Sequence, residues 1–344
     1  MRVALITDGA VVGKDTTDLA SALIRLGHEP IVHVDTDSVW RYRRKAEDWF
    51  TERWRSTTPE VVHCRSRISG QAAVTTAHLL GIPFVFNVRA ADSAPFGPPE
   101  RAVAQCADRV IAGYTAERTE LVIGQVPDHR IRVVPFGVDV EHFTPDGDSP
   151  SPGRRHRLLA VGDPMPSSGF ATAVAALAGL PDTELLVAGP PPQGAHAKDL
   201  RSYARRLGVS HRLEILGDVG TDELPGLMRS ADTVVVTPWR PRFGAPAIEA
   251  AACGTPVVAV NTGGLTDTVV DGVTGLLVPP RRPRLLATAI RKLLTAPVLI
   301  GQCGAAARER ACARYSWDQV ALETVAVYEQ ARADSPVTAR AALG

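Results

Sequence analysis

Short apolar runs alternate with amphipathic stretches along almost the whole chain. Runs rich in β-branched and apolar residues, such as RVALI at 2–6 and IRVVPFG at 131–137, alternate with longer stretches that have apolar residues at helical spacing. Parallel strands need a crossover, usually a helix, between them. The alternation therefore predicts parallel sheets covered by helices. The sequence has no internal repeat of the length that is typical of solenoid proteins.

One segment breaks the alternation, and it divides the chain. In FTPDGDSPSPGRRHR, residues 143–157, Pro, Gly, Ser and Asp cluster and no periodicity survives. A length of 344 residues suits two domains of about 150 residues each. We therefore expect two Rossmann-like doubly wound domains that face a central cleft, the first over 1–148 and the second over 149–315. Apolar residues at helical spacing predict a last helix over 316–333.

Charge and cysteine content exclude several classes of protein. With 38 Lys and Arg against 37 Asp and Glu, the formal net charge is +1, so neither nucleic acid nor an anionic membrane is expected as the main partner. No run of about 18 apolar residues predicts a membrane span, although peripheral membrane contact stays open. The opening MRVALITDGA is typical of a buried strand rather than a signal peptide. Five widely spaced cysteines without metal-ligand spacing favour a reducing cytoplasm.

Candidate ligand-binding residues lie in glycine-bearing loops after predicted strands. In wound parallel sheets, ligands bind beyond the carboxyl ends of the strands, where strand order reverses. Gly13 ends the loop after the first strand, Gly162 follows the first strand of the second domain, and Gly263 and Gly264 precede a short helix. Glycine lets the backbone approach a ligand, and amides at a helix start attract anions. The Gly263–Gly264 loop is therefore predicted to bind a diphosphate.

A long stretch of the second half resembles a known family. FGAPAIEAAACGTPVVAVNTGGLTDTVVDGVTGLLVPP, residues 243–280, is similar to the nucleotide-binding half of family 4 glycosyltransferases, the large retaining group with the GT-B fold. Further segments match the family's landmarks in order, among them LIRLGHEP, PEVVHC, LLGIPFVFNV, ADRVIAGY, IRVVPFGVDVEHFTP and ARYSWDQVA. The resemblance implies a nucleotide-sugar donor held mainly by the second domain and an acceptor held mainly by the first. It also implies that the last helix crosses back to the first domain.

The resemblance assigns donor-binding roles at matching positions. Glu249 stands where the family has the second of two glutamates, which commonly binds the ribose hydroxyls. The first glutamate usually contacts the donor sugar and falls on Pro241, which offers neither an acceptor side chain nor an N–H. The arginine and lysine that bind the diphosphate in relatives fall on Asp163 and Ser168. The donor-binding residues implied by these matches are Gly13, Gly162, Ser168, Phe243, Gly244, Glu249, Gly263, Gly264 and Leu265.

On the acceptor side, the family often has a histidine after the fourth strand. Arg89 stands at that position, and His63 keeps one half of an H-x-H pattern whose other half is Arg65. Together with Asp92, Arg89 and His63 are the candidate catalytic residues.

Several basic residues are candidates to replace the positive charge missing from the donor site. Arg240 and Arg242 bracket the lost glutamate, and we assign both to the donor site. Arg65, Arg89 and Lys14 follow predicted strands and offer alternatives, because arginine and lysine bind phosphate wherever their head groups reach it.

The resemblance predicts a cytoplasmic glycosyltransferase that moves a sugar from a nucleotide sugar to a small-molecule or glycolipid acceptor with retention. The nucleotide sugar is a substrate, so no cofactor is expected, and no metal is expected because helix termini can neutralise phosphate. Two alternatives stay open: a pseudo-glycosyltransferase that binds nucleotide or a partner without catalysis, and a nucleotide-sugar epimerase of the same fold. A nicotinamide dehydrogenase is disfavoured because neither domain carries G-x-G-x-x-G.

Overall fold

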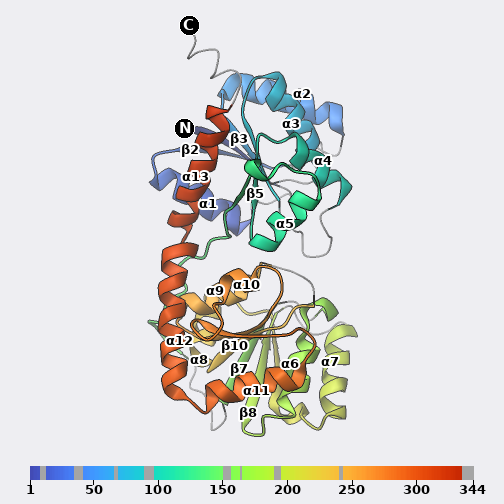
Figure 1. The fold of residues 1–344 in the computed structure, drawn as a ribbon, viewed down its shortest axis with the longest axis vertical. Helices are drawn as coiled ribbons and strands as arrows, with labels where there is room; N and C mark the ends of the chain where they lie inside the picture. The colour runs from blue at the N-terminus through green and yellow to red at the C-terminus, as the bar shows by residue number, and fades with distance from the viewer. Residues whose placement is uncertain are drawn as a thin grey trace. The chain divides into compact units, whose positions relative to one another are not determined.

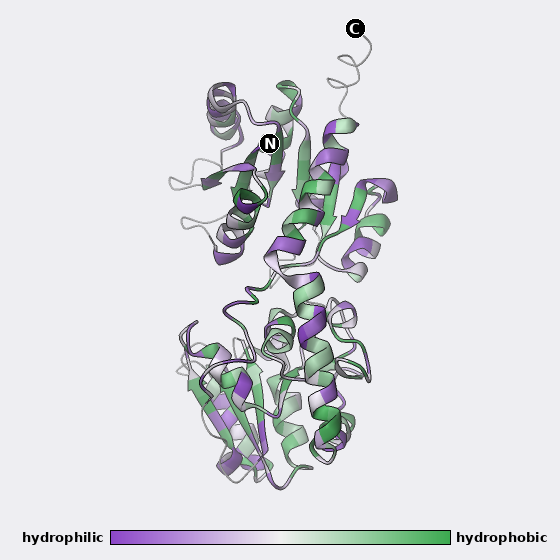
Figure 2. Cartoon of the chain, turned by 90° about the vertical axis from the view of Figure 1, so that its left-hand side faces the viewer, coloured by the Kyte–Doolittle hydropathy of each residue, from purple (hydrophilic) through white to green (hydrophobic). Residues whose placement is uncertain are grey.

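The computed structural model of the chain contains two six-stranded parallel sheets, each covered by helices on both faces (Figure 1). It describes residues 1–7, 13–34, 42–65, 69–88, 97–149, 156–162, 165–189, 195–239 and 243–334. The strands are largely apolar, whereas many helices alternate between polar and apolar residues (Figure 2). Continuous apolar strands are typical of parallel sheets, because helices bury both faces.

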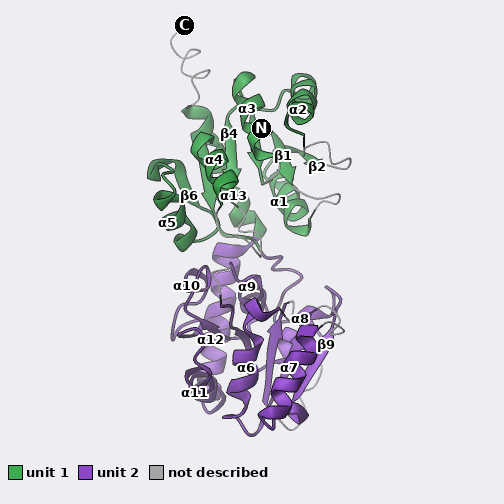
Figure 3. Cartoon of the chain, turned by 90° about the vertical axis from the view of Figure 1, so that its right-hand side faces the viewer, with its two compact units in different colours: residues 1–137, 317–344 green, residues 138–316 purple. Residues whose placement is uncertain are grey.

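The chain divides into two compact units (Figure 3). Unit 1 consists of residues 1–137 and 317–344, and unit 2 of residues 138–316. The predicted boundary after residue 148 thus falls inside unit 2. Phe143 packs into the core of that unit, and Arg229 donates hydrogen bonds to the carbonyls of Thr144 and Asp148 at 3.0 and 2.6 Å. Composition shows that this segment lacks periodicity, but it does not show which unit the segment packs on.

In unit 1 the strand order is β2-β1-β3-β4-β5-β6, with every neighbouring pair parallel. The strands are β1 (Arg2–Thr7), β2 (Glu29–Val34), β3 (Val61–Cys64), β4 (Phe84–Asn87), β5 (Arg109–Ala112) and β6 (Ile131–Val133). The helices are α1 (Lys14–Arg25), α2 (Arg43–Thr57), α3 (Gly70–Leu79), α4 (Pro98–Cys106), α5 (Thr115–Ile123) and α13 (Trp317–Ala333). One buried cluster joins the sheet to α2, α3 and α4, and another joins it to α1 and α13.

The last helix, α13, packs on the first domain, as the resemblance implies. Tyr328 is fully buried, and its hydroxyl lies 2.6 Å from His63 Nδ1 on β3. At the start of the helix, Trp317 packs so closely on Gly137 that a Cβ there would lie 2.3 Å from the indole. Residues from both ends of the sequence therefore complete one core.

In unit 2 the strand order is β12-β11-β10-β7-β8-β9, again all parallel. The strands are β7 (His156–Val161), β8 (Thr183–Ala188), β9 (Leu213–Gly217), β10 (Thr233–Val236), β11 (Val257–Val260) and β12 (Gly275–Val278). The helices are α6 (Phe170–Leu177), α7 (Ala195–Arg206), α8 (Leu224–Ser230), α9 (Ala245–Ala252), α10 (Leu265–Thr268), α11 (Pro283–Leu294) and α12 (Pro297–Arg310). This order is that of a Rossmann domain, so the prediction of two doubly wound domains is confirmed.

Within the described ranges, no single helix is long and apolar enough to cross a membrane. Taken together, segments 283–294 and 297–315 are long and apolar enough for a span, but the chain bends by 98° at the break between them. Leu286, Ile290 and Leu293 of α11 are fully buried in the core of unit 2, as expected of an amphipathic helix on a sheet.

Two buried histidines of unit 1 predict a loss of stability in acid. Burial lowers the pKa of His33 from 6.5 to about 4, and burial with the nearby Arg65 charge lowers that of His63 to about 3. Between these values and pH 6.5, the unfolded chain binds protons that the folded chain does not. The unfolding free energy is therefore expected to fall as the pH drops from about 6.5 to 4, by at most about 1.4 kcal/mol per pH unit for each histidine.

Urea unfolding measured between pH 7 and pH 4.5 checks this expectation. Replacement of His33 by Gln should flatten the pH dependence, whereas replacement of the exposed His129 by Gln should not. A pH dependence that His33→Gln leaves unchanged would contradict the assignment.

Candidate functional site

Loops from two strands meet where the strand order of unit 2 reverses. This reversal lies between β7 and β10, the position at which wound sheets bind ligands. The Trp239 amide, in the loop after β10, donates a hydrogen bond to the Ser167 carbonyl in the loop after β7 at 2.9 Å. The Thr237 hydroxyl donates to the Gly169 carbonyl at 3.1 Å. These bonds fix the two loops against each other.

Two glycines allow the loops to approach so closely. Gly169 has a φ of 72°, and a Cβ there would lie 1.7 Å from the Thr237 carbonyl oxygen. Gly244, which precedes α9, has a φ of 86°, and a Cβ there would lie 2.5 Å from Leu265 Cδ2. The second contact brings the loop after β11 to the loop after β10, so three loops meet at this edge of the sheet.

The third loop, after β11, carries Gly263 and Gly264. Both are buried, and Gly263 has a φ of 56° that favours glycine. Within the described part of the chain, neither amide donates a hydrogen bond. Two hydrogen bonds fix the short helix α10 that follows. Arg310 and Tyr315 both donate to the Asp267 carbonyl, at 2.6 and 3.0 Å.

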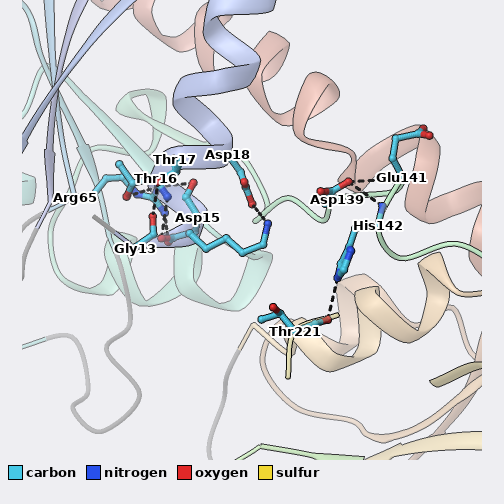
Figure 4. Close-up of polar contacts among 11 residues, drawn as sticks. Gly13, Asp15, Thr16, Thr17, Asp18, Arg65, Asp139, Glu141, His142 and Thr221 are labelled. Atoms are coloured by element: carbon cyan, nitrogen blue, oxygen red, sulfur yellow. Dashed lines mark hydrogen bonds and ion pairs between the residues drawn. The ribbon is translucent and has the colours of Figure 1, made fainter. Parts of the chain in front are cut away.

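Unit 1 has its own reversal, between β1 and β3, and a buried ion pair lies across it. Arg65, directly after β3, is 5% exposed and its Nη2 lies 2.8 Å from Asp15 Oδ2 at the start of α1 (Figure 4). Gly13 caps this helix, and its carbonyl accepts hydrogen bonds from the amides of Thr16 and Thr17. The Arg65 charge is therefore balanced by a carboxylate.

Lys14, on the same helix, is also paired, since its Nζ lies 3.0 Å from Asp18 Oδ2. Two of the basic residues considered as substitutes for the missing charge, Lys14 and Arg65, therefore already face carboxylates. This arrangement weakens both as candidates for the donor diphosphate.

His63 lies inside unit 1 rather than on its surface. It is 2% exposed, bonded to Tyr328, and held neutral at pH 7 by a pKa lowered to about 3. A cavity of about 20 Å³ beside it is also lined by Arg65 and Asn87 and has room for one water. The geometry favours a structural role for His63, the attachment of α13 to β3.

Comparison with known sequences identifies the family. The Glycosyltransferase Family 4 profile matches residues 12–142, and the Glycosyl transferases group 1 profile matches residues 146–310. A D-inositol 3-phosphate glycosyltransferase of Actinosynnema mirum is 35% identical over 311 residues, covering 79% of this chain and 73% of the relative. The chain belongs to the family 4 glycosyltransferases. A second relative of the same name, from Xylanimonas cellulosilytica, is 31% identical and covers 98% of this chain and 83% of its own length.

Solved structures show that this transferase has the GT-B fold. A glycosyltransferase from Rickettsia africae superimposes with a TM-score of 0.84 at 18% identity, covering 97% of this chain and 99% of that one. Anabaena HepE, solved in complex with UDP and glucose, gives a TM-score of 0.77 at 19% identity, covering 96% and 99%.

The structure brings most of the predicted donor residues of the transferase to one edge of unit 2. Phe243 and Gly244 stand before α9, Leu265 packs on Gly244, and Glu249 lies half-buried in α9. Ser168 belongs to the single turn Pro166–Ser168 in the loop after β7. Gly162, at the end of β7, has a φ of 132° and opens the same loop. Gly13 belongs to unit 1.

Other predicted site residues lie outside the described ranges. These are Arg89, Asp92, Asp163, Arg240, Pro241 and Arg242. Their roles stay predictions.

The sequence does not show the pairings that fix the loops. Asp15 and Arg65 are 50 positions apart, and Arg310 is 43 positions from Asp267. No local pattern marks such pairs. The signal that could have found Thr237 and Trp239 is their place directly after a buried strand.

Proposed function

We propose that this transferase moves a sugar from a nucleoside diphosphate sugar, held by unit 2, to a small-molecule acceptor held by unit 1, with retention at the anomeric carbon. The observation that carries the donor assignment is the meeting of three loops at the β7–β10 reversal, beside Glu249. HepE, which shares the fold, is solved with UDP-glucose. Relatives named D-inositol 3-phosphate glycosyltransferases favour a small acceptor over a glycolipid.

In this arrangement each residue type has a chemical task. The Glu249 carboxylate accepts hydrogen bonds from the two ribose hydroxyls, which orients the nucleoside. The amides of Gly263 and Gly264 donate to the diphosphate, where negative charge builds up as the sugar departs. His142 Nε2 lies 2.9 Å from the carbonyl of Thr221, in the loop after β9 where we place the base (Figure 4).

Removal of the Glu249 carboxylate tests the donor site. Loss of hydrogen bonds to a charged acceptor costs about 1.5 to 3 kcal/mol, so Glu249→Ala should weaken nucleoside diphosphate binding by roughly ten- to a hundredfold. Calorimetric titration of the protein with UDP, ADP and GDP measures the change. Glu309→Ala, at an exposed position of α12, is the matched control and should bind as wild type does. Equal affinity of the Glu249→Ala variant would refute the assignment.

We also propose that transfer needs no metal ion, because backbone amides and arginine side chains can neutralise the diphosphate. Among the described residues, no group of three or more His, Cys, Asp or Glu is placed to hold a metal. The sequence has two Asp-x-Asp patterns: Asp35 to Asp37 follows β2 and lies outside those residues, and Asp146 to Asp148 lies within them. We expect turnover in excess EDTA to equal that with added Mg²⁺ or Mn²⁺. Loss of activity in the chelator and its return with either ion would contradict the proposal and draw attention to Asp35 and Asp37.

The cytoplasm is the compartment we propose, because the cysteines suit a reducing environment. Cys64, Cys253 and Cys303 are buried free thiols, and burial raises the pKa of Cys253 to about 12. Such thiols are inert.

A second function, nucleotide binding without catalysis, is favoured by one observation. Ser168 stands in the β7 loop at the position where the resemblance to the family implies a lysine, and a hydroxyl supplies no positive charge there. A wild-type protein that binds a nucleotide sugar but neither transfers nor releases the sugar would select this function.

A further inference from the structure

A cation outside the family's phosphate-binding positions lies at the donor edge of unit 2. The guanidinium carbon of Arg281, three residues after β12, stands 4.8 Å from the centroid of the Trp239 ring. Because β11 lies between β12 and β10, the Arg281–Trp239 pair bridges the loops that flank the Gly263–Gly264 loop. The pair thus connects two strand ends at the edge where we place the diphosphate.

Trp239 is held in place by the loop after β7. Its amide donates to the Ser167 carbonyl, and Gly169 lies so close that a Cβ there would be 3.0 Å from the indole Cδ1. The indole Nε1 is buried and has no hydrogen-bond partner in the structure. The ring is therefore a fixed platform beside the loop in which Ser168 replaces the family's lysine.

The Arg281 guanidinium is available to bind an anion. Its φ is 57°, a left-handed conformation that is uncommon for a residue other than glycine. The side chain is exposed, and within the described part of the chain no carboxylate pairs with it. An arginine stacked on an aromatic ring keeps its in-plane N–H donors available for bidentate contact with phosphate.

We propose that Arg281, held over the Trp239 ring, binds the donor diphosphate and supplies part of the positive charge that the usual arginine and lysine positions lack. The proposal rests on the proposed function, because it needs a nucleoside diphosphate at this edge. Arg281 differs in this respect from Lys14 and Arg65, each of which is paired with a carboxylate. Arg281 contacts the phosphates, whereas Glu249 contacts the nucleoside. Substitution of Arg281 should therefore weaken only ligands that carry phosphate.

The test compares nucleoside diphosphates with nucleosides by calorimetry. UDP, ADP and GDP are titrated into wild type, and the tightest of them is compared with its own nucleoside. Arg281→Ala should weaken the diphosphate by ten- to a hundredfold and leave the nucleoside within twofold. Arg281→Lys keeps the charge but loses the paired N–H donors of the guanidinium, so its affinity for the diphosphate should lie between those of wild type and Arg281→Ala. Arg282→Ala removes the neighbouring exposed arginine and should match wild type.

The outcomes separate this inference from the function on which it rests. A diphosphate that binds wild type and Arg281→Ala equally overturns the role of Arg281 and leaves the donor site standing. Equal weakening of diphosphate and nucleoside also overturns it, because the contact is then not with phosphate. If none of the three diphosphates binds wild type, the donor site fails, and the role of Arg281 fails with it.

Discussion

Charge reversal at one of the two arginines beside Pro241, Arg240→Glu or Arg242→Glu, is expected to slow sugar transfer by about one to two powers of ten, the effect of losing one charge-assisted contact. Departure of a nucleoside diphosphate concentrates negative charge on its β-phosphate, and stabilisation of that charge is usually the largest catalytic effect. With Asp163 and Ser168 at the usual positions, two charge-assisted contacts of about 1.5 to 3 kcal/mol each are absent. A helix N-terminus offers at most about 2 kcal/mol, which is too little to replace them.

Single-turnover rates on a donor that binds measure this effect without interference from product release. Arg205→Glu, on the exposed face of α7, makes the same charge change elsewhere in unit 2 and should leave the rate unchanged. If both reversals leave transfer intact, the charge does not come from this loop, and Arg281 is the described candidate without a carboxylate partner.

Substitution of Gly169 by Ala should produce a large loss of stability in unit 2. The added Cβ meets the Thr237 carbonyl at 1.7 Å in a backbone with φ of 72°, so both overpacking and strain apply. Each contributes roughly 1 to 3 kcal/mol. Together they amount to roughly 2 to 6 kcal/mol, so for a unit of this size the melting temperature should fall by roughly 4 to 24 °C, at about 2 to 4 °C per kcal/mol. Nucleotide binding should weaken with it, because the same contact joins two donor loops.

Gly208 provides the matched control for this prediction. Its φ is also 72°, but a Cβ there would meet nothing within 4 Å. Gly208→Ala therefore carries only the backbone strain, and differential scanning calorimetry of both variants separates strain from overpacking. Equal melting temperatures for Gly169→Ala and Gly208→Ala would show that the loops do not meet as described.

The fold could be predicted because its signals are local. Apolar runs and helical spacing occur within windows of a few residues, and the order of family landmarks fixes the architecture. The contacts that build the donor edge are not local. Gly169 touches Thr237, 68 positions away, and the sequence shows only that a glycine follows a strand. Close approach of two backbones leaves no pattern except the glycine itself.

His63 illustrates a different limit. It follows valines in a strand that is buried on both faces, so no alternation indicates which way its ring points. The resemblance implies a catalytic role, which stays a prediction, and the structure shows a buried ring whose Nδ1 lies 2.6 Å from the Tyr328 hydroxyl of α13. Phe143 is similar: its segment looks like a linker by composition, but the aromatic ring docks in a core. In both cases tertiary packing decides where the side chain lies.

The most direct test of sugar transfer is NMR of a mixture of the protein, D-inositol 3-phosphate and each of UDP-, ADP- and GDP-glucose. Transfer with retention predicts a new anomeric signal with the configuration of the donor, together with an equal amount of free nucleoside diphosphate. An inverted configuration would contradict retention. A donor that binds by calorimetry yet yields neither product nor free nucleoside diphosphate with this acceptor would contradict sugar transfer to D-inositol 3-phosphate.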